Sequence, residues 1–399
     1  MKSLKLNFVV LALVAFAFSP FALAEIALTA GPYLQNPGET SVSVMWITSA
    51  SSTATVEYGI GDELDKKAVS THDGQIDANT TIHRVDITGL TAGSKYNYRV
   101  VSTEILKYAP YKVTFGETIN SETFSFTTLD SKKTACSFVV FNDIHSNVKN
   151  LGVRVELANK KPYEMIFLNG DILQDPGSEK LIIDTLLKPA SDLFASRIPM
   201  LLARGNHETR GAYSRKLKNY VALPDNNYYY SFKHGPVYFI VLDVGEDKED
   251  SNREYSGLNE FDSYRDEQTK WLKKEIKKRE FKEAQFRVVL THIPLFGGGK
   301  GHGTLDCRNK WAATLNKGKI DLHISGHTHR PAVVEAVKGV HDYPVFIGGG
   351  PHDEKFTVIR VDVANEELSV SMINHSGEVI ETYKAKQKKK GLLESVLGS

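Results

Sequence analysis

The stretch that decides the fold is Phe138-Val139-Val140-Phe141-Asn142-Asp143-Ile144-His145, in which an apolar run of strand length ends in side chains of the kinds that bind metals. The same order recurs farther along the chain. Apolar runs end at Leu168, Ala203, Leu290 and Ile324, and carboxylate, amide or imidazole side chains follow each of them. Loops at the carboxyl ends of strands in an α/β sheet converge on one crevice. We therefore expect these loops to meet at a single site.

The polar side chains in these loops form one ordered set: Asp143, His145, Asp171, Asn206, His292, His327 and His329. Carboxylate, imidazole and amide oxygen suit hard to borderline divalent or trivalent metals rather than thiophilic ones. One site uses about four to six protein ligands, so this larger set predicts two ions held close together. Gly170, Gly205 and Gly326 each precede a ligand or its neighbour, which suits tight turns that bring the backbone close to the metals.

The segments between the strands indicate an α/β domain. Residues 147–159 and 178–196 carry helical spacing, and further helices are expected around residues 266–280 and 309–315. Alternation of strand and helix implies parallel pairing through crossover connections. The last strands, after residue 333, have an antiparallel pattern.

The first part of the chain has a different periodicity. Across residues 26–128, short runs alternate between apolar and polar side chains, as in Val42-Ser43-Val44 and Tyr96-Asn97-Tyr98, and Gly and polar turns separate them. This pattern predicts a β-sandwich over residues 25–130. Leu90 lies six residues before Tyr96, which has the form of a tyrosine corner. A spacer packed on the second domain is the favoured interpretation, and a docking or substrate-rim module is the alternative.

Both ends of the chain predict segments outside the two domains. Lys2 and Lys5 precede an apolar run over residues 8–18, and Ala22-Leu23-Ala24 follows. This is the pattern of a signal peptide over residues 1–24, and the run is shorter than the roughly 20 residues of a membrane span. We therefore expect an exported protein, periplasmic or secreted, with no membrane attachment after cleavage. Residues 384–399 are expected to form a polar tail.

Net charge and cysteine content bear on the possible partners and on disulfides. The net charge of +1 gives no support to nucleic acid or an anionic membrane as a partner. Cys136 and Cys307 are the only cysteines, which is too few for a disulfide framework, and whether they pair stays open.

On these motifs the chain resembles the calcineurin-like metallophosphoesterase superfamily. That pattern is Asp-x-His, Gly-Asp, Gly-Asn-His-Glu/Asp, a lone His and Gly-His-x-His, and all five motifs are intact within residues 135–375. The sandwich in front of this domain is similar to the layout of purple acid phosphatases, which have a fibronectin-III-type N-terminal domain. The resemblance implies an all-β sandwich followed by an α/β domain with a four-layer αββα architecture.

The resemblance also implies roles for individual residues. The first metal would be held by Asp143, His145 and His329, the second by Asn206, His292 and His327, and Asp171 would bridge both. The ions expected are two divalent or trivalent transition metals, namely manganese, zinc or iron. A metal-activated hydroxide would attack phosphorus in line. His207 would donate a hydrogen bond or proton to the departing oxygen, and Asp175 either orients His207 or is a surface turn residue.

The chain departs from purple acid phosphatases at two positions. They have Asp-x-Gly in the first motif and a metal-binding Tyr three residues after the bridging Asp, whereas this chain has His145 and Gln174 there. The phenolate that colours a ferric centre is missing, so we expect a colourless enzyme with less preference for iron(III).

Three functions are compatible with these residues. The favoured one is a phosphomonoesterase, resembling acid phosphatases, that acts on small phosphorylated substrates. A phosphodiesterase or nucleotide hydrolase would use the same site, because the motifs describe the phosphoryl group and not the leaving group. A non-catalytic binding or adhesion module is disfavoured, because the whole ligand set and His207 would have to persist without use. Arg204 and Glu208 are expected to support their loop, and residues 246–254 to form a solvated loop or a lid.

Overall fold

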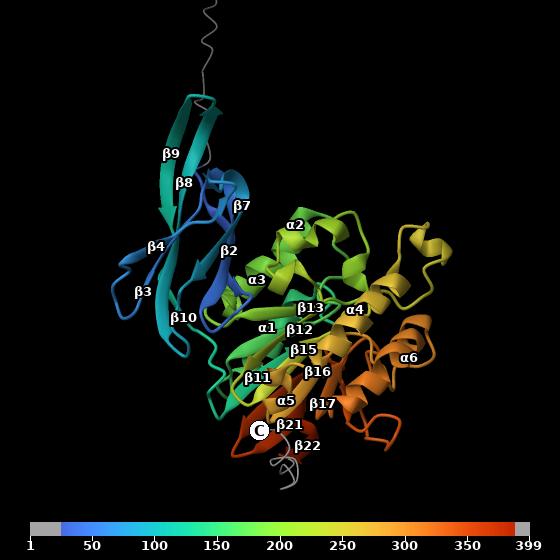
Figure 1. Cartoon of the computed structure of the whole chain (residues 1–399). Helices are drawn as coiled ribbons and strands as arrows, with labels where there is room; N and C mark the ends of the chain where they lie inside the picture. Colours follow the sequence, from blue (N-terminus) through green and yellow to red (C-terminus); the bar gives the residue numbers. More distant parts are fainter. Residues whose placement is uncertain (1–24, 388–399) are drawn as a thin grey trace, which may run out of the picture.

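The computed structural model describes residues 25–387, so the predicted signal peptide and the last residues of the predicted tail lie outside the described residues. A β-rich N-terminal domain packs against a larger α/β domain (Figure 1). Within the described part of the chain, no helix is both long enough and apolar enough to cross a membrane.

The N-terminal domain is an antiparallel β-sandwich, as predicted. One half is β1–β2–β7, the other is β4–β3–β8 with β9 and β10 also paired to β8, and a single Ser52–Glu104 pair joins them. Their shared core contains Val44, Trp46, Tyr98 and other buried apolar side chains. The strands are β1 (Leu28–Gln35), β2 (Ser41–Thr53), β3 (Thr55–Gly59), β4 (Lys66–Ala68), β7 (Ala78–Thr88), β8 (Lys95–Ala109), β9 (Lys112–Asn120) and β10 (Phe124–Thr127), and β5 (Thr71–His72) and β6 (Gln75–Ile76) form a separate ribbon.

The predicted tyrosine corner is present. The backbone N–H of Thr91 donates a hydrogen bond to the hydroxyl of Tyr96 at 3.0 Å. Tyr96 itself is buried and stacks on Phe126, with ring centroids 5.8 Å apart. The turn before β8 is therefore tied to the sandwich core.

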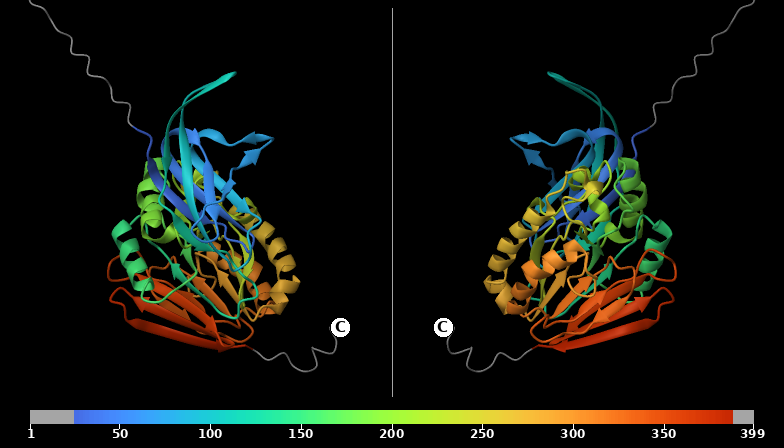
Figure 2. Two further views of the ribbon diagram at one scale, coloured as in Figure 1. Left: turned by 90° about the vertical axis from the view of Figure 1, so that its left-hand side faces the viewer. Right: turned by 90° about the vertical axis from the view of Figure 1, so that its right-hand side faces the viewer.

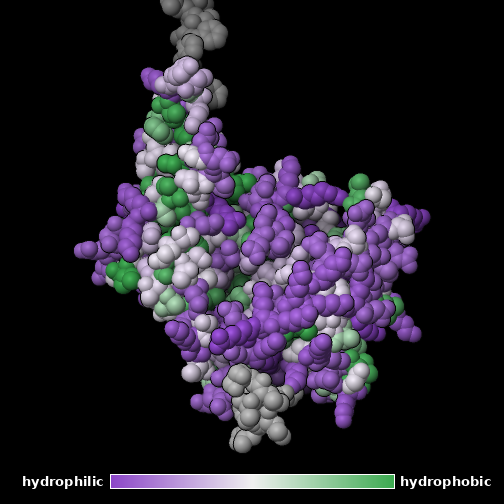
Figure 3. Space-filling view, in the orientation of Figure 1, coloured by the Kyte–Doolittle hydropathy of each residue, from purple (hydrophilic) through white to green (hydrophobic). Residues whose placement is uncertain are grey.

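The far end of the β8–β9 hairpin extends beyond the sandwich and carries exposed apolar side chains. Leu106, Tyr108 and Phe115 are all more than half exposed. In the space-filling view, apolar residues gather along this hairpin while most of the visible face of the α/β domain is hydrophilic (Figure 3).

Two six-stranded sheets form the centre of the second domain. The first has the order β13–β12–β11–β20–β21–β22 and the second β14–β15–β16–β17–β19–β18. The first comprises β11 (Cys136–Phe141), β12 (Met165–Asn169), β13 (Met200–Ala203), β20 (Thr357–Ala364), β21 (Glu367–Asn374) and β22 (Val379–Lys386). The second comprises β14 (Tyr230–His234), β15 (Val237–Val241), β16 (Phe286–Leu290), β17 (Leu322–Ser325), β18 (Ala332–Val334) and β19 (Val345–Ile347). Strands β11 to β13 pair in parallel, as do β15, β16, β17 and β19.

The sheets pack face to face, with helices on the outside. Phe138 on β11 meets Phe239 on β15 edge to face, with ring centroids 5.0 Å apart. A second core, which includes Leu272, Val289 and Trp311, lies between the second sheet and its helices. Figure 2 shows α1 on one side of the sheets and α4 and α6 on the other, which confirms the predicted αββα arrangement. The helices are α1 (Val148–Ala158), α2 (Glu179–Ile182), α3 (Lys188–Ala190), α4 (Phe261–Glu275), α5 (Arg279–Glu283) and α6 (His302–Lys317), and π-helical turns flank α3 over Ile183–Leu187 and Ser191–Ala195.

Three expectations about this domain need correction. Strand β22 runs to Lys386, past both the predicted boundary at residue 375 and the predicted start of the tail at residue 384. It is an edge strand with mostly exposed side chains, so its sequence resembles a polar tail. Helix α6 begins at His302, seven residues before the expected start at 309, and it contains Cys307. Cys136 and Cys307 are both buried and free, so they do not pair.

The sandwich packs tightly on the α/β domain. Tyr33, Met45 and Ile47 from β1 and β2 belong to the same apolar cluster as β11 and β12. The hydroxyl of Tyr33 donates to the carbonyl of Tyr220 at 3.0 Å, and the backbone N–H of Ala222 donates to Gln35 Oε1 at 2.6 Å. These contacts match the interpretation of the sandwich as a packed domain.

We predict that Tyr33→Phe lowers the free energy of unfolding by about 1–3 kcal/mol, because it leaves the buried carbonyl of Tyr220 without its donor. Urea unfolding followed by fluorescence measures the change. Tyr111→Phe is the matched control, since Tyr111 is fully exposed. Equal unfolding midpoints for both variants would contradict the prediction.

Candidate metal centre

The structure brings the seven predicted ligands together. They lie in the loops that follow β11, β12, β13, β16 and β17, all at carboxyl ends of parallel strands. Three of these strands belong to one sheet and two to the other. The candidate centre therefore sits where the two packed sheets present the same edge.

The ligand atoms form two clusters with one residue in common. One atom each from Asp143, His145, Asp171 and His329 lies within 4.8 Å of the others, and the same holds for Asp171, His292 and His327. The seventh residue, Asn206, joins the second cluster, because its Oδ1 lies 3.0 Å from Nδ1 of His327. Asp171 is the shared member, which is the place that a bridging carboxylate would take.

Within each cluster, imidazole nitrogens lie close to carboxylate oxygens, and in one cluster two imidazole nitrogens also face each other. His292 Nε2 lies 3.0 Å from Asp171 Oδ2. In the other cluster, the Nε2 atoms of His145 and His329 face each other at 3.1 Å, and His329 Nε2 is 3.3 Å from Asp143 Oδ1. Carboxylate oxygens and imidazole nitrogens that converge in this way suit first-row metals such as manganese, zinc and iron. The residues present therefore fit two such ions.

The backbone at the centre is strained. Five candidate ligands have left-handed φ values, namely Asp143 (52°), His145 (49°), Asp171 (51°), His327 (71°) and His329 (55°). Such values are uncommon outside glycine and cluster at functional sites, where the surrounding structure imposes them. The turn after β11 and the turn after β17 each carry two candidate ligands, and both ligands of each turn have a left-handed backbone conformation.

All three predicted glycines are required by close approach, and at Gly205 a Cβ would lie 2.3 Å from Asp171 Oδ1. Gly170 has a φ of +82°, and a Cβ there would overlap the ring of His292. At Gly326 a Cβ would lie 2.5 Å from Asp143 Oδ2. At each of these positions a side chain would collide with a candidate ligand.

A buried carboxylate, that of Glu208, organises the bridging loop. It accepts hydrogen bonds from the backbone N–H groups of Asp171 at 2.8 Å, of Leu173 at 2.9 Å and of Gly205 at 2.9 Å. Burial and the nearby charge of Asp171 raise the pKa of Glu208. The interpretation of Glu208 as a support for the loop is therefore confirmed.

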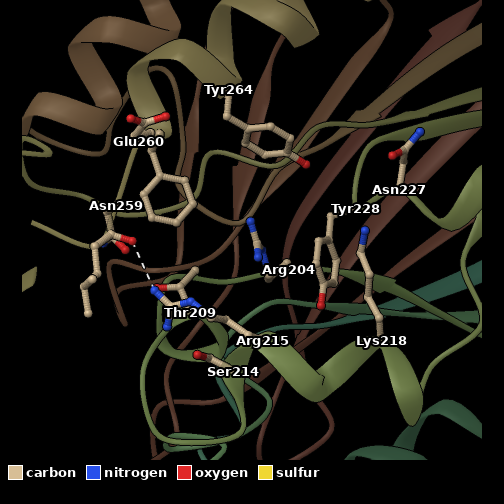
Figure 4. Close-up of a pocket in the computed structure, with 12 residues that line it drawn as sticks. Arg204, Thr209, Ser214, Arg215, Lys218, Asn227, Tyr228, Asn259, Glu260 and Tyr264 are labelled. Atoms are coloured by element: carbon tan, nitrogen blue, oxygen red, sulfur yellow. Dashed lines mark hydrogen bonds between the residues drawn. The ribbon is translucent and has the colours of Figure 1, made fainter.

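Arg204 also has a supporting role. Its guanidinium pairs with Asp243 at 2.6 Å and lies over the ring of Tyr228, with 4.0 Å from Cζ to the ring centroid. Arg204 lines a cavity of about 430 Å³, and none of the seven candidate ligands lines that cavity. Figure 4 shows Arg204 in this cavity together with Thr209 and Tyr264.

The electrostatics of the second cluster are those of a cation site. Burial lowers the pKa of His292, but the charges of Asp171 and Asp143 outweigh it, and the pKa rises to about 10. Burial and the neighbouring His292 lower the pKa of His327 to about 4. Burial opposes ionisation of Asp171, yet His292 holds the pKa of that carboxyl well below its usual range. The buried carboxylate of Asp171 is therefore stabilised by positive charge beside it.

His207 lies at the edge of the two clusters. Its Nδ1 is 2.6 Å from the carbonyl oxygen of Gln174, so Nδ1 carries the proton and donates. Nε2 lies 3.9 Å from Asp171 Oδ2 and 3.3 Å from a terminal nitrogen of Arg210. The group that orients His207 is thus the Gln174 carbonyl and not the carboxylate of Asp175.

Three buried or half-buried residues near the centre escaped sequence analysis. Arg154, on α1, is fully buried and donates to the carbonyl oxygens of Asn142 and Gly350.

Arg210 and Glu246 form an ion pair at 2.8 Å beside His207. Residues 246–254 are expected from the sequence to form a solvated loop or a lid. The first of them, Glu246, is buried, so the expectation of a solvated loop is wrong at this residue. A polar residue in an amphipathic helix or a charged loop gives no sequence signal of burial; only the closeness of Arg210 to the Gly-Asn-His-Glu motif could have drawn attention to it.

Family models match both domains. Residues 136–331 match the model for the calcineurin-like phosphoesterases. Residues 30–128 match the model for the N-terminal domain of purple acid phosphatases. The predicted resemblance is therefore confirmed for both parts of the chain.

Relatives and solved structures agree with these matches. The probable purple acid phosphatase 20 of Arabidopsis thaliana is 24% identical over 317 residues, which cover 73% of this chain and 66% of that protein. Purple acid phosphatase 23 of the same plant is 25% identical over 43% of this chain and 37% of that protein. The chain thus spans at most about two thirds of the length of these relatives.

Two solved structures share the fold. The purple acid phosphatase PPD1 from yellow lupin (Lupinus luteus) seeds gives a TM-score of 0.67 at 14% identity over 90% of this chain and 74% of that one. PhoD gives a TM-score of 0.60 at 13% identity over 90% of this chain and 88% of that one. At such identities the likeness concerns the fold alone.

We predict that Gly326→Ala weakens metal binding about 10- to 100-fold, because the added methyl group displaces the carboxylate of Asp143. Calorimetric titration with manganese or zinc measures the affinity. Gly152→Ala is the control, since a Cβ at that position meets nothing within 4 Å. Unchanged affinity in Gly326→Ala would remove Asp143 from the candidate ligands.

Proposed function

We propose that this protein is an exported phosphohydrolase that uses two metal ions and acts on small phosphomonoesters. The observation that carries the proposal is the pair of ligand clusters that share Asp171. The family match supports hydrolysis of phosphoric esters as the reaction. Export rests on the pattern of residues 1–24, which lie outside the described residues.

The proposed ligand sets follow the clusters. Asp143, His145 and His329 would hold one ion, while Asn206, His292 and His327 would hold the other, with Asp171 between them. Manganese, zinc or iron fits these donors. When bound, such ions activate water for attack and neutralise charge on the phosphoryl oxygens.

The chain's own groups would position and protonate the substrate. His207 has only Nε2 available, because the Gln174 carbonyl holds the proton on Nδ1. In its protonated form, Nε2 would donate a hydrogen bond or the proton to the departing oxygen of the ester. Gln174 contributes a second contact, since its Oε1 lies 3.1 Å from Nδ1 of His145 and limits rotation of that ring.

We predict that His207→Ala lowers kcat about 10²- to 10⁴-fold for phosphate esters with poor leaving groups, because such esters need a proton on the departing oxygen. Activity on 4-nitrophenyl phosphate should fall less, since that leaving group departs without protonation. Both rates are measured on metal-loaded protein, with metal content determined by mass spectrometry.

His72→Ala is the matched control, because His72 is an exposed histidine of the N-terminal domain that contacts Asp77. The control should keep the wild-type rates. If His207→Ala hydrolyses alkyl phosphates at the wild-type rate with both metals bound, His207 has no part in the reaction. A panel of monoesters and diesters tests the substrate class, and faster cleavage of diesters would replace the monoesterase by a phosphodiesterase.

The iron-loaded protein should be colourless. Gln174 occupies the position where purple acid phosphatases have a tyrosine, so a phenolate-to-iron charge-transfer band should be missing from the visible spectrum. Absorption spectroscopy of the protein loaded with ferric iron tests this expectation, and the protein loaded with zinc provides the baseline. A strong visible band would show that another tyrosine reaches the metals.

A further inference from the structure

Beside the two ligand clusters, Arg210 and Glu246 form a polar pair that the proposed ligands and His207 do not explain. Arg210 follows His207 in the chain by three residues, and Glu246 comes from the loop after β15. The side chain of Arg210 is 34% exposed, whereas that of Glu246 is 1% exposed. A half-exposed cation is thus held by a buried anion at the rim of the candidate centre.

Glu246 holds Arg210 in one orientation. Its Oε1 accepts from Arg210 Nε at 2.9 Å and its Oε2 from the second terminal nitrogen at 2.8 Å. The hydroxyls of Thr209 and Tyr255 donate to the same carboxylate at 2.8 and 3.0 Å. A two-point contact with a carboxylate fixes the plane of a guanidinium.

The main chain of Glu246 is itself anchored. Arg265 on α4 is fully buried and donates to the carbonyl oxygens of Val244 at 2.9 Å and Glu246 at 2.6 Å. The loop that presents the carboxylate is therefore attached to a helix, so the position of Arg210 is set before any substrate arrives.

The other edge of the guanidinium faces the candidate centre. Its remaining terminal nitrogen lies 3.3 Å from His207 Nε2, and that atom lies 3.9 Å from Asp171 Oδ2. A group that lies against His207 and the shared carboxylate is consequently within reach of Arg210. This terminal nitrogen carries two N–H groups, and only one of them can point to His207 Nε2, so the other is available to a ligand.

A planar guanidinium with fixed donors matches the oxygens of a phosphoryl group. Glu246 and Asp247, at 2.8 and 3.7 Å, offset much of the positive charge of Arg210, so its contribution is directional hydrogen bonding. The candidate ligands are carboxylates, imidazoles and an amide, and they add no cationic donor to the phosphoryl oxygens.

We propose that Arg210 binds a non-bridging oxygen of the phosphoryl group and that Glu246 is the positioning residue for Arg210. This inference rests on the proposed function for the identity of the substrate, but it concerns binding of the anion and not its hydrolysis.

Binding of inorganic phosphate to the full chain loaded with manganese tests the proposal. By calorimetry, Arg210→Ala should bind phosphate about 10- to 100-fold more weakly than the wild type, as expected for the loss of a hydrogen bond to a charged group. Arg210→Lys should recover only part of this loss, because an ammonium lacks the planar fork. Manganese content should stay at the wild-type level in both variants.

Arg84→Ala is the matched control. Arg84 lies in the N-terminal domain and forms the same two-point contact with Asp86, with both distances at 3.0 Å. The control should bind phosphate like the wild type. Glu246→Gln keeps the shape of the side chain but loses the anionic acceptor, so it should weaken phosphate binding and raise KM, with a smaller change in kcat.

A purely structural role predicts different results. In that case Arg210→Ala would lower the melting temperature or the manganese content while the loaded fraction bound phosphate with wild-type affinity, and this outcome overturns the proposal. Wild-type protein that binds manganese but no phosphate also overturns it. If phosphate binding depends on Arg210 but no ester is hydrolysed, the proposed function fails and this inference stands.

Discussion

The carboxylate of Asp171 is the interaction on which the rest of the candidate centre depends. It belongs to both ligand clusters, lies 3.0 Å from His292, and accepts the backbone N–H of His207 at 2.9 Å. A buried carboxylate is costly unless positive charge and hydrogen bonds compensate it. Histidines and a backbone donor therefore surround this side chain. Glu208 holds the backbone of the loop that carries it.

The αββα architecture makes that gathering possible. Two parallel strand sets end at the same edge because Phe138, Phe167 and Phe239 pack between the sheets. The loops at this edge are short, so their ligands adopt left-handed backbone conformations that the packed core must sustain. Stability of the core and geometry of the site are thus linked, and the N-terminal sandwich adds to the same apolar cluster through Tyr33 and Met45.

The elements of the site are predictable from the sequence because their signals are local. An apolar run followed by Asp, Asn or His shows where a strand ends and which side chain comes next, and Gly170 and Gly326 indicate close approach. Burial that depends on distant partners is not predictable in this way. Glu246 lies in a charge-rich loop and yet is buried by Arg210, Thr209 and Tyr255, and the polar strand β22 is recognisable only from its pairing with β21.

The sequence by itself determined the two domains, their order and the seven candidate ligands, because hydrophobic periodicity and residue type are properties of short segments. Only the tertiary structure decided which ligands share a cluster, that Gln174 orients His207 through its carbonyl, and that Arg210 is held by Glu246. These facts depend on distances between residues that lie far apart in the chain, and such distances exist only after the two sheets have packed.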